Sequence, residues 1–172
     1  MQKPDNIGFD RNGTLKLFDF GLAKELKESE RLDDGNFRLT GFTGSVRYMA
    51  PEVCLGQPYE LSCDAYSFSM LLWHMLALEP PFAMYSEKRV IERVQKKGKR
   101  PEVFKKWPRD IGNMLRLAWG EDTYERPSFV EIVSILKQEV IPSDGATVST
   151  SASGRSRASR SSKRKSIRRM SN

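Results

Sequence analysis

An amide and a carboxylate near the start of the chain have the chemistry of a ligand-binding pair. Asn6 and Asp19 flank two short apolar stretches, 7–9 and 15–18, which are joined by a turn containing Asn12-Gly13. Pairing of these stretches as a small β-hairpin brings both side chains to the same end. Their oxygens are hard ligands of the kind that suits Mg²⁺. A plain hairpin with polar ends is the alternative interpretation.

Three motifs surround this hairpin in a fixed order. Lys3-Pro4-Asp5-Asn6 precedes it, Asp19-Phe20-Gly21 follows it, and Gly44-Ser45-Val46-Arg47-Tyr48-Met49-Ala50-Pro51-Glu52 comes further along. In this order they resemble the end of the catalytic loop and the activation segment of a protein kinase. The Gly-rich loop, strand Lys, helix Glu and His-Arg-Asp triplet that complete the family's signature do not occur in this sequence.

The resemblance implies catalytic roles for three residues. Asn6 and Asp19 would hold the Mg²⁺ that accompanies ATP, and Lys3 would reach the transferred phosphate. A Lys at this point favours Ser/Thr kinases over Tyr kinases, and the sequence resembles the tyrosine-kinase-like group of Ser/Thr kinases. The family's catalytic base lies five residues before the metal-binding Asn, and Met1 stands there. Because a thioether cannot accept a hydroxyl proton, we expect this chain alone to be inactive, with weak or no ATP binding.

The polar stretch from Leu22 to Thr43 is expected to be the mobile activation loop. Phosphate on Thr40 or Thr43 would order it by pairing with Arg38 or Arg47. An exposed loop also simply contains hydroxyl residues, so this expectation has a plain alternative. Ser45 occupies the position of a Thr that helps seat the substrate in the family, and it keeps the hydroxyl.

Several helices are predicted to support these loops. Pro51 opens a short one, and the stretch from Leu61 to Leu78 is apolar on nearly every face, as a buried helix is. It resembles the central helix of the kinase C-lobe, in which Asp64 would hold the catalytic-loop backbone. Asp64 could equally be a first-turn capping acid. His74, on the same helix, is expected to be buried and hydrogen-bonded rather than catalytic.

Later segments complete the predicted C-lobe. Ser86 caps a basic segment that continues to Lys106, either a docking site for an acidic substrate or partner or a solvated face. A helix from Pro108 to Trp119 should bury Ile111, Met114, Leu115 and Leu117, and a last helix follows Arg126-Pro127. The resemblance implies a structural, buried salt bridge between Arg126 and Glu52.

The net charge of +7 lies entirely in the last part of the chain. Residues 142–172 are rich in serine and basic residues and poor in large apolar ones, so they are predicted to be a disordered tail. Ser166 and Ser171 follow basic clusters and resemble sites for basophilic kinases. The same clusters resemble a nuclear-localisation or nucleic-acid patch, and a generic solvating tail is the alternative.

We therefore expect a mainly α fold with a small β-hairpin, the lower part of a protein-kinase-like C-lobe, at residues 1–141, and a disordered basic tail at 142–172. The expected function in a full-length parent is ATP-dependent phosphorylation of Ser/Thr on a protein substrate or signalling partner. One alternative is a non-catalytic, kinase-derived scaffold. Another alternative is nucleic-acid binding. It would involve the basic tail, because the domain has equal numbers of basic and acidic residues and gives no sign of binding nucleic acid. Free Cys54 and Cys63 and the absence of a signal or membrane-spanning pattern favour an intracellular, cytoplasmic location, with nuclear import through the tail as an option.

Overall fold

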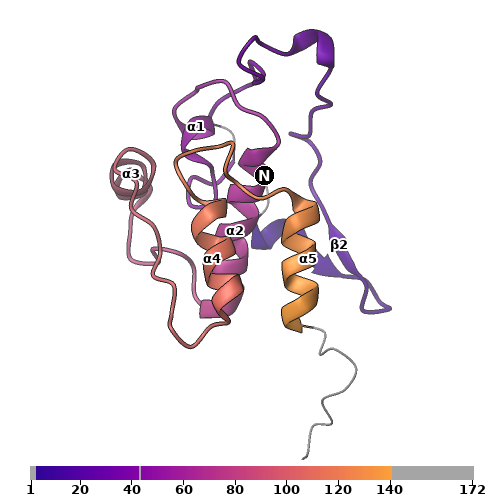
Figure 1. The fold of residues 1–172 in the computed structure, drawn as a ribbon, viewed down its shortest axis with the longest axis vertical. Helices are drawn as coiled ribbons and strands as arrows, with labels where there is room; N and C mark the ends of the chain where they lie inside the picture. The colour runs from indigo at the N-terminus through magenta and orange to yellow at the C-terminus, as the bar shows by residue number, and fades with distance from the viewer. Residues whose placement is uncertain (1–2, 43, 141–172) are drawn as a thin grey trace, which may run out of the picture. The chain divides into compact units, whose positions relative to one another are not determined.

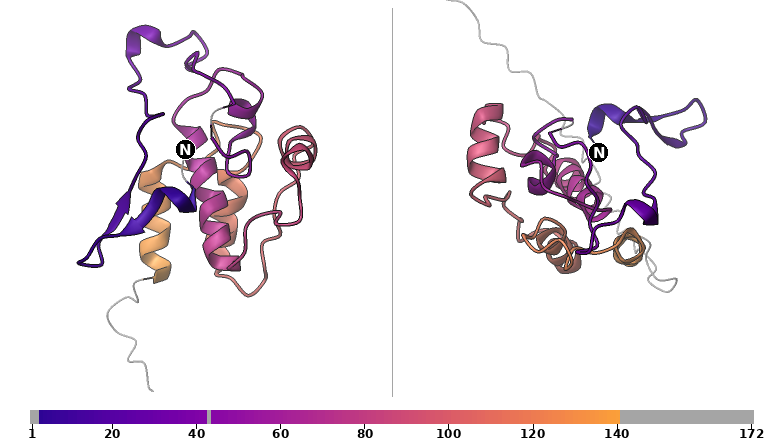
Figure 2. Two further views of the ribbon diagram at one scale, coloured as in Figure 1. Left: turned by 180° about the vertical axis from the view of Figure 1, so that it is seen from behind. Right: turned by 90° about the horizontal axis from the view of Figure 1, so that it is seen from above.

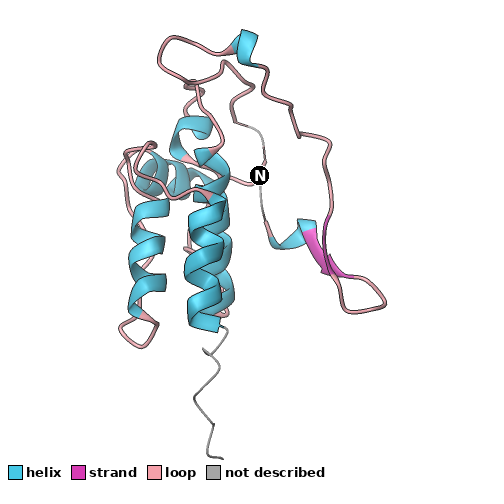
Figure 3. Cartoon of the chain, turned by 45° about the vertical axis from the view of Figure 1, so that its right-hand side comes forward, coloured by secondary structure: helices cyan, strands magenta, loops and turns pink. Residues whose placement is uncertain are grey.

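The computed structural model describes residues 3–42 and 44–140. The expectations about Met1, Thr43, Ser166, Ser171 and the tail at 142–172 therefore lie outside the described residues. The elements in chain order are listed here with their bounds: η1 Pro4–Asn6, β1 Ile7–Phe9, β2 Leu15–Leu17, η2 Glu28–Glu30, α1 Pro51–Cys54, α2 Ser62–Ala77, α3 Glu87–Val90, the π-helical turn η3 Ile91–Gln95, α4 Arg109–Ala118 and α5 Phe129–Val140. The prediction of a mainly α fold with one small hairpin is confirmed (Figure 3).

The hairpin forms because its turn is built from local interactions. Strands β1 and β2 pair antiparallel, with Ile7 opposite Leu17 and Phe9 opposite Leu15. The Asp10 carboxylate accepts hydrogen bonds from the backbone N–H groups of Asn12 and Thr14, both at 2.9 Å. Gly13 has a φ of 76°, a left-handed conformation that glycine adopts at no steric cost. The turn residues thus fix the register of the two strands.

Among the helices that the structure describes, α2 contributes the most buried residues (its place in the fold is shown in Figure 1). Its buried apolar side chains include Tyr66, Met70, Leu72 and Trp73. The expectation of a helix buried on nearly every face is wrong in the last turn, since Met75 is 51% exposed. Leu78 ends the helix with a φ of 58° and is also exposed. None of the helices in the described ranges has the length and apolar character that a membrane crossing requires.

Helix α4 packs against α2, and α5 packs against α4 (Figures 1 and 2). Ile111, Met114 and Leu115 of α4 are buried, as predicted, and Ile132 of α5 joins the same core. Leu117 is half exposed, so its predicted place in the buried stripe is wrong. It lies two positions beyond Leu115, which in a helix of 3.6 residues per turn turns it to the opposite face.

Helix α3 and the turn η3 form one continuous basic segment, as the sequence predicted. The Ser86 hydroxyl accepts a hydrogen bond from the backbone N–H of Arg89 at 3.4 Å, so Ser86 is the N-cap. Val90 and Val94 are fully buried on one side of the segment, while its lysines and arginines lie on the other. This amphipathic division fastens the segment to the core and leaves its charged face in solvent.

Candidate active site

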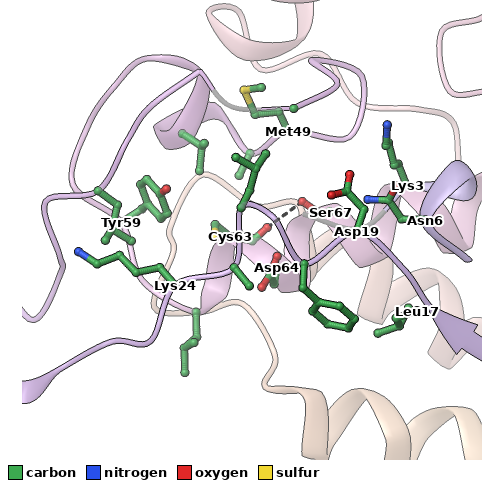
Figure 4. A pocket seen from close by; sticks show the side chains of 18 of the residues that line it. Lys3, Asn6, Leu17, Asp19, Lys24, Met49, Tyr59, Cys63, Asp64 and Ser67 are labelled. Carbon is green, nitrogen blue, oxygen red and sulfur yellow. Dashed lines mark hydrogen bonds between the residues drawn. The ribbon is translucent and has the colours of Figure 1, made fainter.

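Asn6 and Asp19 lie side by side at the open end of the hairpin. The backbone N–H of Phe18 donates to the carbonyl of Asn6 at 2.8 Å, which extends the strand pairing by one residue and brings the next residue, Asp19, beside Asn6. Figure 4 shows the two side chains near each other, with Lys3 alongside. The arrangement therefore gathers an amide oxygen, a carboxylate and an ammonium group in one place, as the local sequence pattern predicts.

Asp19 adopts an uncommon backbone conformation. Its φ is 57°, in the left-handed region that most residues avoid and that Asp tolerates better than bulky residues do. Outliers of this kind cluster at ligand clamps and active sites, because the surrounding structure must hold them. The turn of the backbone here directs the carboxylate into the cavity described below (Figure 4).

Lys3 carries the positive charge of the group. Its Nζ lies 3.8 Å from the carboxylate of Asp5, whose side chain is 82% exposed. An ion pair this long and this accessible to water contributes little energy. The ammonium of Lys3 can therefore exchange Asp5 for a more highly charged anion.

These residues line a cavity of about 490 Å³. Its walls come from the hairpin end, the activation segment and the first turns of α2, with Lys24, Glu60 and Asp64 adding charge. Within the described residues no group of three or more His, Cys, Asp or Glu side chains could hold a metal ion by itself. Asn6 and Asp19 nevertheless fit Mg²⁺, because this ion takes one or two carboxylates and completes its shell with water and phosphate oxygens.

Cys63, which also lines the cavity, is not a nucleophile. Burial raises the pKa of its thiol to about 12, with the neighbouring Asp64 carboxylate adding to the effect. The thiolate, which is the reactive form, is therefore negligible at neutral pH.

The loop 44–50, which follows the activation loop, is held by hydrogen bonds from two sides. The Gln95 amide donates to the carbonyls of Val46 and Met49, both at 2.9 Å. The Arg47 guanidinium donates to three carbonyls of the segment 81–85, those of Pro81, Phe82 (2.6 Å) and Tyr85 (3.3 Å). Ser45 is half-buried at the start of this loop, and its carbonyl accepts from the N–H of Tyr48 at 3.0 Å.

The partners of Arg47 in this loop differ from the sequence-based expectation. Arg47 was one of two candidates to pair with a phosphate on the activation loop, but its guanidinium is engaged by the three carbonyls. Arg38 is exposed and remains the candidate partner, and Thr40 is exposed close to it in the chain. The Tyr59 hydroxyl donates to the Thr40 carbonyl at 3.0 Å, which fastens the backbone there.

Below the loop, Glu52 and Arg126 form the ion pair that the sequence motifs implied. Two nitrogens of the guanidinium bond the two carboxylate oxygens, at 2.6 and 3.0 Å. The side chains are 8% and 1% exposed, respectively. The remaining donors of Arg126 bond the carbonyls of Ser62 and Gly120 at 3.3 Å, so the buried charge is well satisfied.

Comparison with known proteins identifies this arrangement. The family model described as "Protein kinase domain" matches residues 2–138. The chain belongs to the protein kinase family. The match covers the hairpin, the activation segment and the helices, so the resemblance noted in the sequence is confirmed, and the kinase domain here consists of C-lobe elements.

Curated proteins of Dictyostelium discoideum and Arabidopsis thaliana are similar to this chain. The dual specificity protein kinase shkB of Dictyostelium discoideum is 37% identical over 87% of the chain and 22% of its own length. The serine/threonine-protein kinases VIK and STY17 of Arabidopsis thaliana are 39% and 32% identical, over 83% and 79% of the chain and 33% and 23% of their own lengths. The chain thus spans at most a third of these relatives. Two of the three are named serine/threonine-protein kinases and the third a dual specificity protein kinase, and these names do not favour the scaffold alternative.

Two anchors of the kinase's loop 44–50 were missed by sequence reasoning. Gln95 and the carbonyls it binds are 46 and 49 residues apart, and Arg47 is 34 or more from its acceptors. A local pattern carries no information about such contacts. The only available signal was Gln95 itself, which stands beside Val94 on the apolar side of an otherwise basic segment.

Proposed function

We propose that this chain provides the lower half of the active site of a Mg²⁺- and ATP-dependent protein serine/threonine kinase. The observation that carries this proposal is the meeting of Asn6, Asp19 and Lys3 at one cavity, in a chain that belongs to the kinase family. Asn6 and Asp19 hold Mg²⁺ through their side-chain oxygens, and Lys3 contacts the phosphate that is transferred. The protein substrate presents its hydroxyl beside Ser45 in the loop 44–50, which we call the substrate loop.

Each residue has a defined task in this proposal. Asn6 and Asp19 would hold Mg²⁺, which would supply neutralisation of the charge on the phosphate oxygens. Asp19, turned inward by its positive φ, and Asn6, held by the extended hairpin, position the ion. The Lys3 ammonium stabilises the charge of the transferred group. The position five residues before Asn6 holds Met1, which cannot take the substrate proton, so we expect the chain by itself to show no measurable transfer.

Phosphorylation of the activation loop is part of the same proposal. Thr40 and Thr43 are the candidate acceptors, and a phosphate on either would pair with Arg38. Arg47 serves instead to hold the loop 44–50 against the segment 81–85. The phosphorylated loop would then be ordered next to a substrate loop that is already fastened.

The metal site is tested by paramagnetic broadening in the isotope-labelled chain. Mn²⁺, which stands in for Mg²⁺, is added together with ADP, and we expect the amide and side-chain signals of Asn6 and Asp19 to broaden first. Asp19→Asn should abolish this effect and keep the fold, because Asn also tolerates a positive φ. Asp33→Asn, in an exposed part of the loop, is the matched control. Broadening that is centred elsewhere, or that survives Asp19→Asn, would contradict the assignment.

The activity is tested in a chimera. The upstream half of a protein kinase of established activity, including its Gly-rich loop and catalytic Asp, is joined to this chain. We expect transfer from ATP to Ser or Thr of a protein substrate, reduced at least about a hundredfold by Asp19→Asn. A folded chimera that transfers phosphate equally well with Asp19→Asn would exclude the proposed role.

A further inference from the structure

A cluster of exposed cations covers the outer face of α3 and η3. We call it the basic patch, and it consists of Lys88, Arg89, Arg93, Lys96, Lys97 and Lys99, all exposed. The segment 86–100 contains seven basic and two acidic residues, although the chain up to residue 141 has equal numbers of both. The patch is therefore a local excess of positive charge on an otherwise balanced unit, which attracts anions from a distance.

The patch is not neutralised by the kinase's own carboxylates. Lys96 pairs with Glu92 at 2.7 Å, and in the part of the chain that the structure describes this is the one salt bridge the patch makes. Glu87, the other acidic residue of the segment, is exposed at the start of α3. Five cations are thus left facing solvent, and they can pair with an anionic partner without first breaking an internal ion pair.

Tyr85 marks the centre of the patch. The Arg89 guanidinium lies 4.2 Å from the centroid of the Tyr85 ring, and the Lys99 ammonium lies 5.6 Å from it. A hydrogen bond from Lys99 and the charges of Lys99, Arg89 and Arg93 lower the pKa of the Tyr85 phenol, so all three cations act at this one point. Stacking on the ring restricts the two nearer cations, which reduces the entropy lost when an anion binds them.

The basic patch is mechanically tied to the substrate loop. Gln95, on η3 beneath the patch, holds the carbonyls of Val46 and Met49. Arg47 of the same loop holds the carbonyl of Tyr85 at the patch centre. A partner bound to the patch is therefore held at a fixed position relative to Ser45, where the proposed function places the substrate hydroxyl.

We propose that the basic patch docks an acidic segment, rich in Asp and Glu, of the kinase's protein substrate. The proposal rests on the proposed function in that the partner is a protein substrate. Charge complementarity selects the segment, and the ties through Gln95 and Arg47 place it beside the loop that receives the hydroxyl. Docking at a distance from the reacting group lets the kinase choose a substrate by composition rather than by the residues next to the hydroxyl.

The test measures binding of a fluorescein-labelled peptide of alternating Glu and Ser to the full 172-residue chain, without ATP. The variant carries Arg89→Gln, Arg93→Gln and Lys99→Gln, which removes the three cations around Tyr85. We expect binding to weaken about tenfold or more, and to weaken steeply with added salt in the unchanged chain. The reference peptide replaces every Glu with Gln and should not bind.

Two variants with the same loss of charge are the matched controls. One replaces Arg11, Lys27 and Lys137, which are exposed elsewhere on the unit, and the other replaces Lys163, Arg164 and Lys165 in the basic tail, each with Gln. In both variants the affinity for the peptide should fall by less than about twofold. A variant with Arg89→Lys and Arg93→Lys keeps the positive charges and should bind the peptide as the unchanged chain does. Equal losses in a control variant, or no binding by the unchanged chain, would overturn the proposal.

A short single-stranded RNA of equal charge is the competing probe. If the RNA binds more tightly than the peptide, and the patch variant removes this binding, the surface recognises nucleic acid and the proposal is wrong. Because the assay contains no nucleotide and needs no transfer, an inactive chain still reports on docking. Peptide binding that fails while the kinase chimera remains active would overturn the docking proposal alone.

Discussion

Arg126 and Glu52, 74 residues apart in the chain, bind each other through two hydrogen bonds, from Nη1 to Oε1 and from Nη2 to Oε2. Glu52 lies in α1, directly after the substrate loop, and Arg126 lies just before α5. The Arg126 guanidinium is also 5.2 Å from the ring centroid of Tyr66 in the central helix. One buried cation therefore joins the end of the activation segment to the helices that form the core.

Removing one member of this pair should destabilise the protein strongly. Arg126→Ala leaves the Glu52 carboxylate buried without a counter-charge, and we expect a loss of about 3 to 5 kcal/mol in the free energy of unfolding. Urea denaturation followed by circular dichroism measures the change. Arg109→Ala, at an exposed position of α4, is the control and should change stability by less than about 0.5 kcal/mol. A loss of similar size in both variants would contradict the assignment.

Removal of the Gln95 amide should make the substrate loop less ordered. Gln95→Leu leaves the carbonyls of Val46 and Met49 without donors in a buried setting, which should cost about 1 to 3 kcal/mol. Hydrogen exchange at Tyr48, whose N–H bonds Ser45, should become faster in this variant. Gln138→Leu, at an exposed position of α5, should leave both properties unchanged. Unaltered exchange in Gln95→Leu would show that the loop does not depend on this side chain.

Stability should fall at alkaline pH because two buried acids keep their protons in the folded state. Burial raises the pKa of Cys63 from its ordinary 9.0 to about 12, and that of Tyr66 from 10.0 to about 12. Above pH 9 the unfolded chain releases protons that the folded chain retains, so the free energy of unfolding decreases as pH rises toward 12. Each group contributes up to about 1.4 kcal/mol per pH unit within its range.

Urea denaturation at several pH values between 8 and 12 measures this fall. Cys63→Ala removes one of the two groups and should give a shallower pH dependence than the unchanged chain. At pH 8 the thiol is protonated in both the folded and the unfolded state. The difference in stability between the variant and the unchanged chain at this pH therefore gives the cost of the substitution itself. Identical slopes for the two proteins would mean that Cys63 does not titrate as its burial implies.

One face of the hairpin should cause self-association. Phe9 is 73% exposed, and Leu15 opposite it and Leu17 next on the same face are about half exposed. Phe20 and Leu61 are exposed as well, at 67% and 68%. Large apolar side chains gathered in this way promote aggregation or partner binding. We expect the isolated chain to be marginally stable and to sediment as a mixture of oligomers.

Phe9→Ser with Leu15→Ser should reduce this association, as measured by sedimentation velocity. Val130→Ser is the control, because Val130 is 81% exposed but lies on α5, outside the hairpin. It should leave the distribution of species unchanged. A sharp, cooperative thermal transition from a monomeric unchanged chain would contradict this prediction.

The parts of the fold that sequence predicted well are those that local interactions determine. The hairpin follows from its turn, and α5 begins where Ser128 and Glu131 exchange capping hydrogen bonds. Asn6 and Asp19 come together as a direct consequence of the hairpin. The family motifs supplied the Glu52–Arg126 pair, which spacing alone would not have indicated.

The parts that sequence did not predict depend on neighbours far along the chain. Leu117 and Leu115 have the same hydrophobicity; the face of α4 that packs against α2 contains Leu115, and the helical period then turns Leu117 to solvent. Arg47 was one of two candidate partners for a phosphate, whereas the fold gives it three backbone carbonyls as hydrogen-bond acceptors. Gln95 looked like one more polar residue in a basic helix, yet it is 4% exposed.

The hydrogen bonds from Arg47 to the segment 81–85 affect which amino-acid changes this segment can tolerate. All three of its acceptors are main-chain oxygens, which every amino acid possesses. The side chains of this segment are not needed for these hydrogen bonds, provided that the backbone path is kept. Mutations can therefore change the side chains beside the substrate loop without moving the loop itself. Such changes can alter which partner binds.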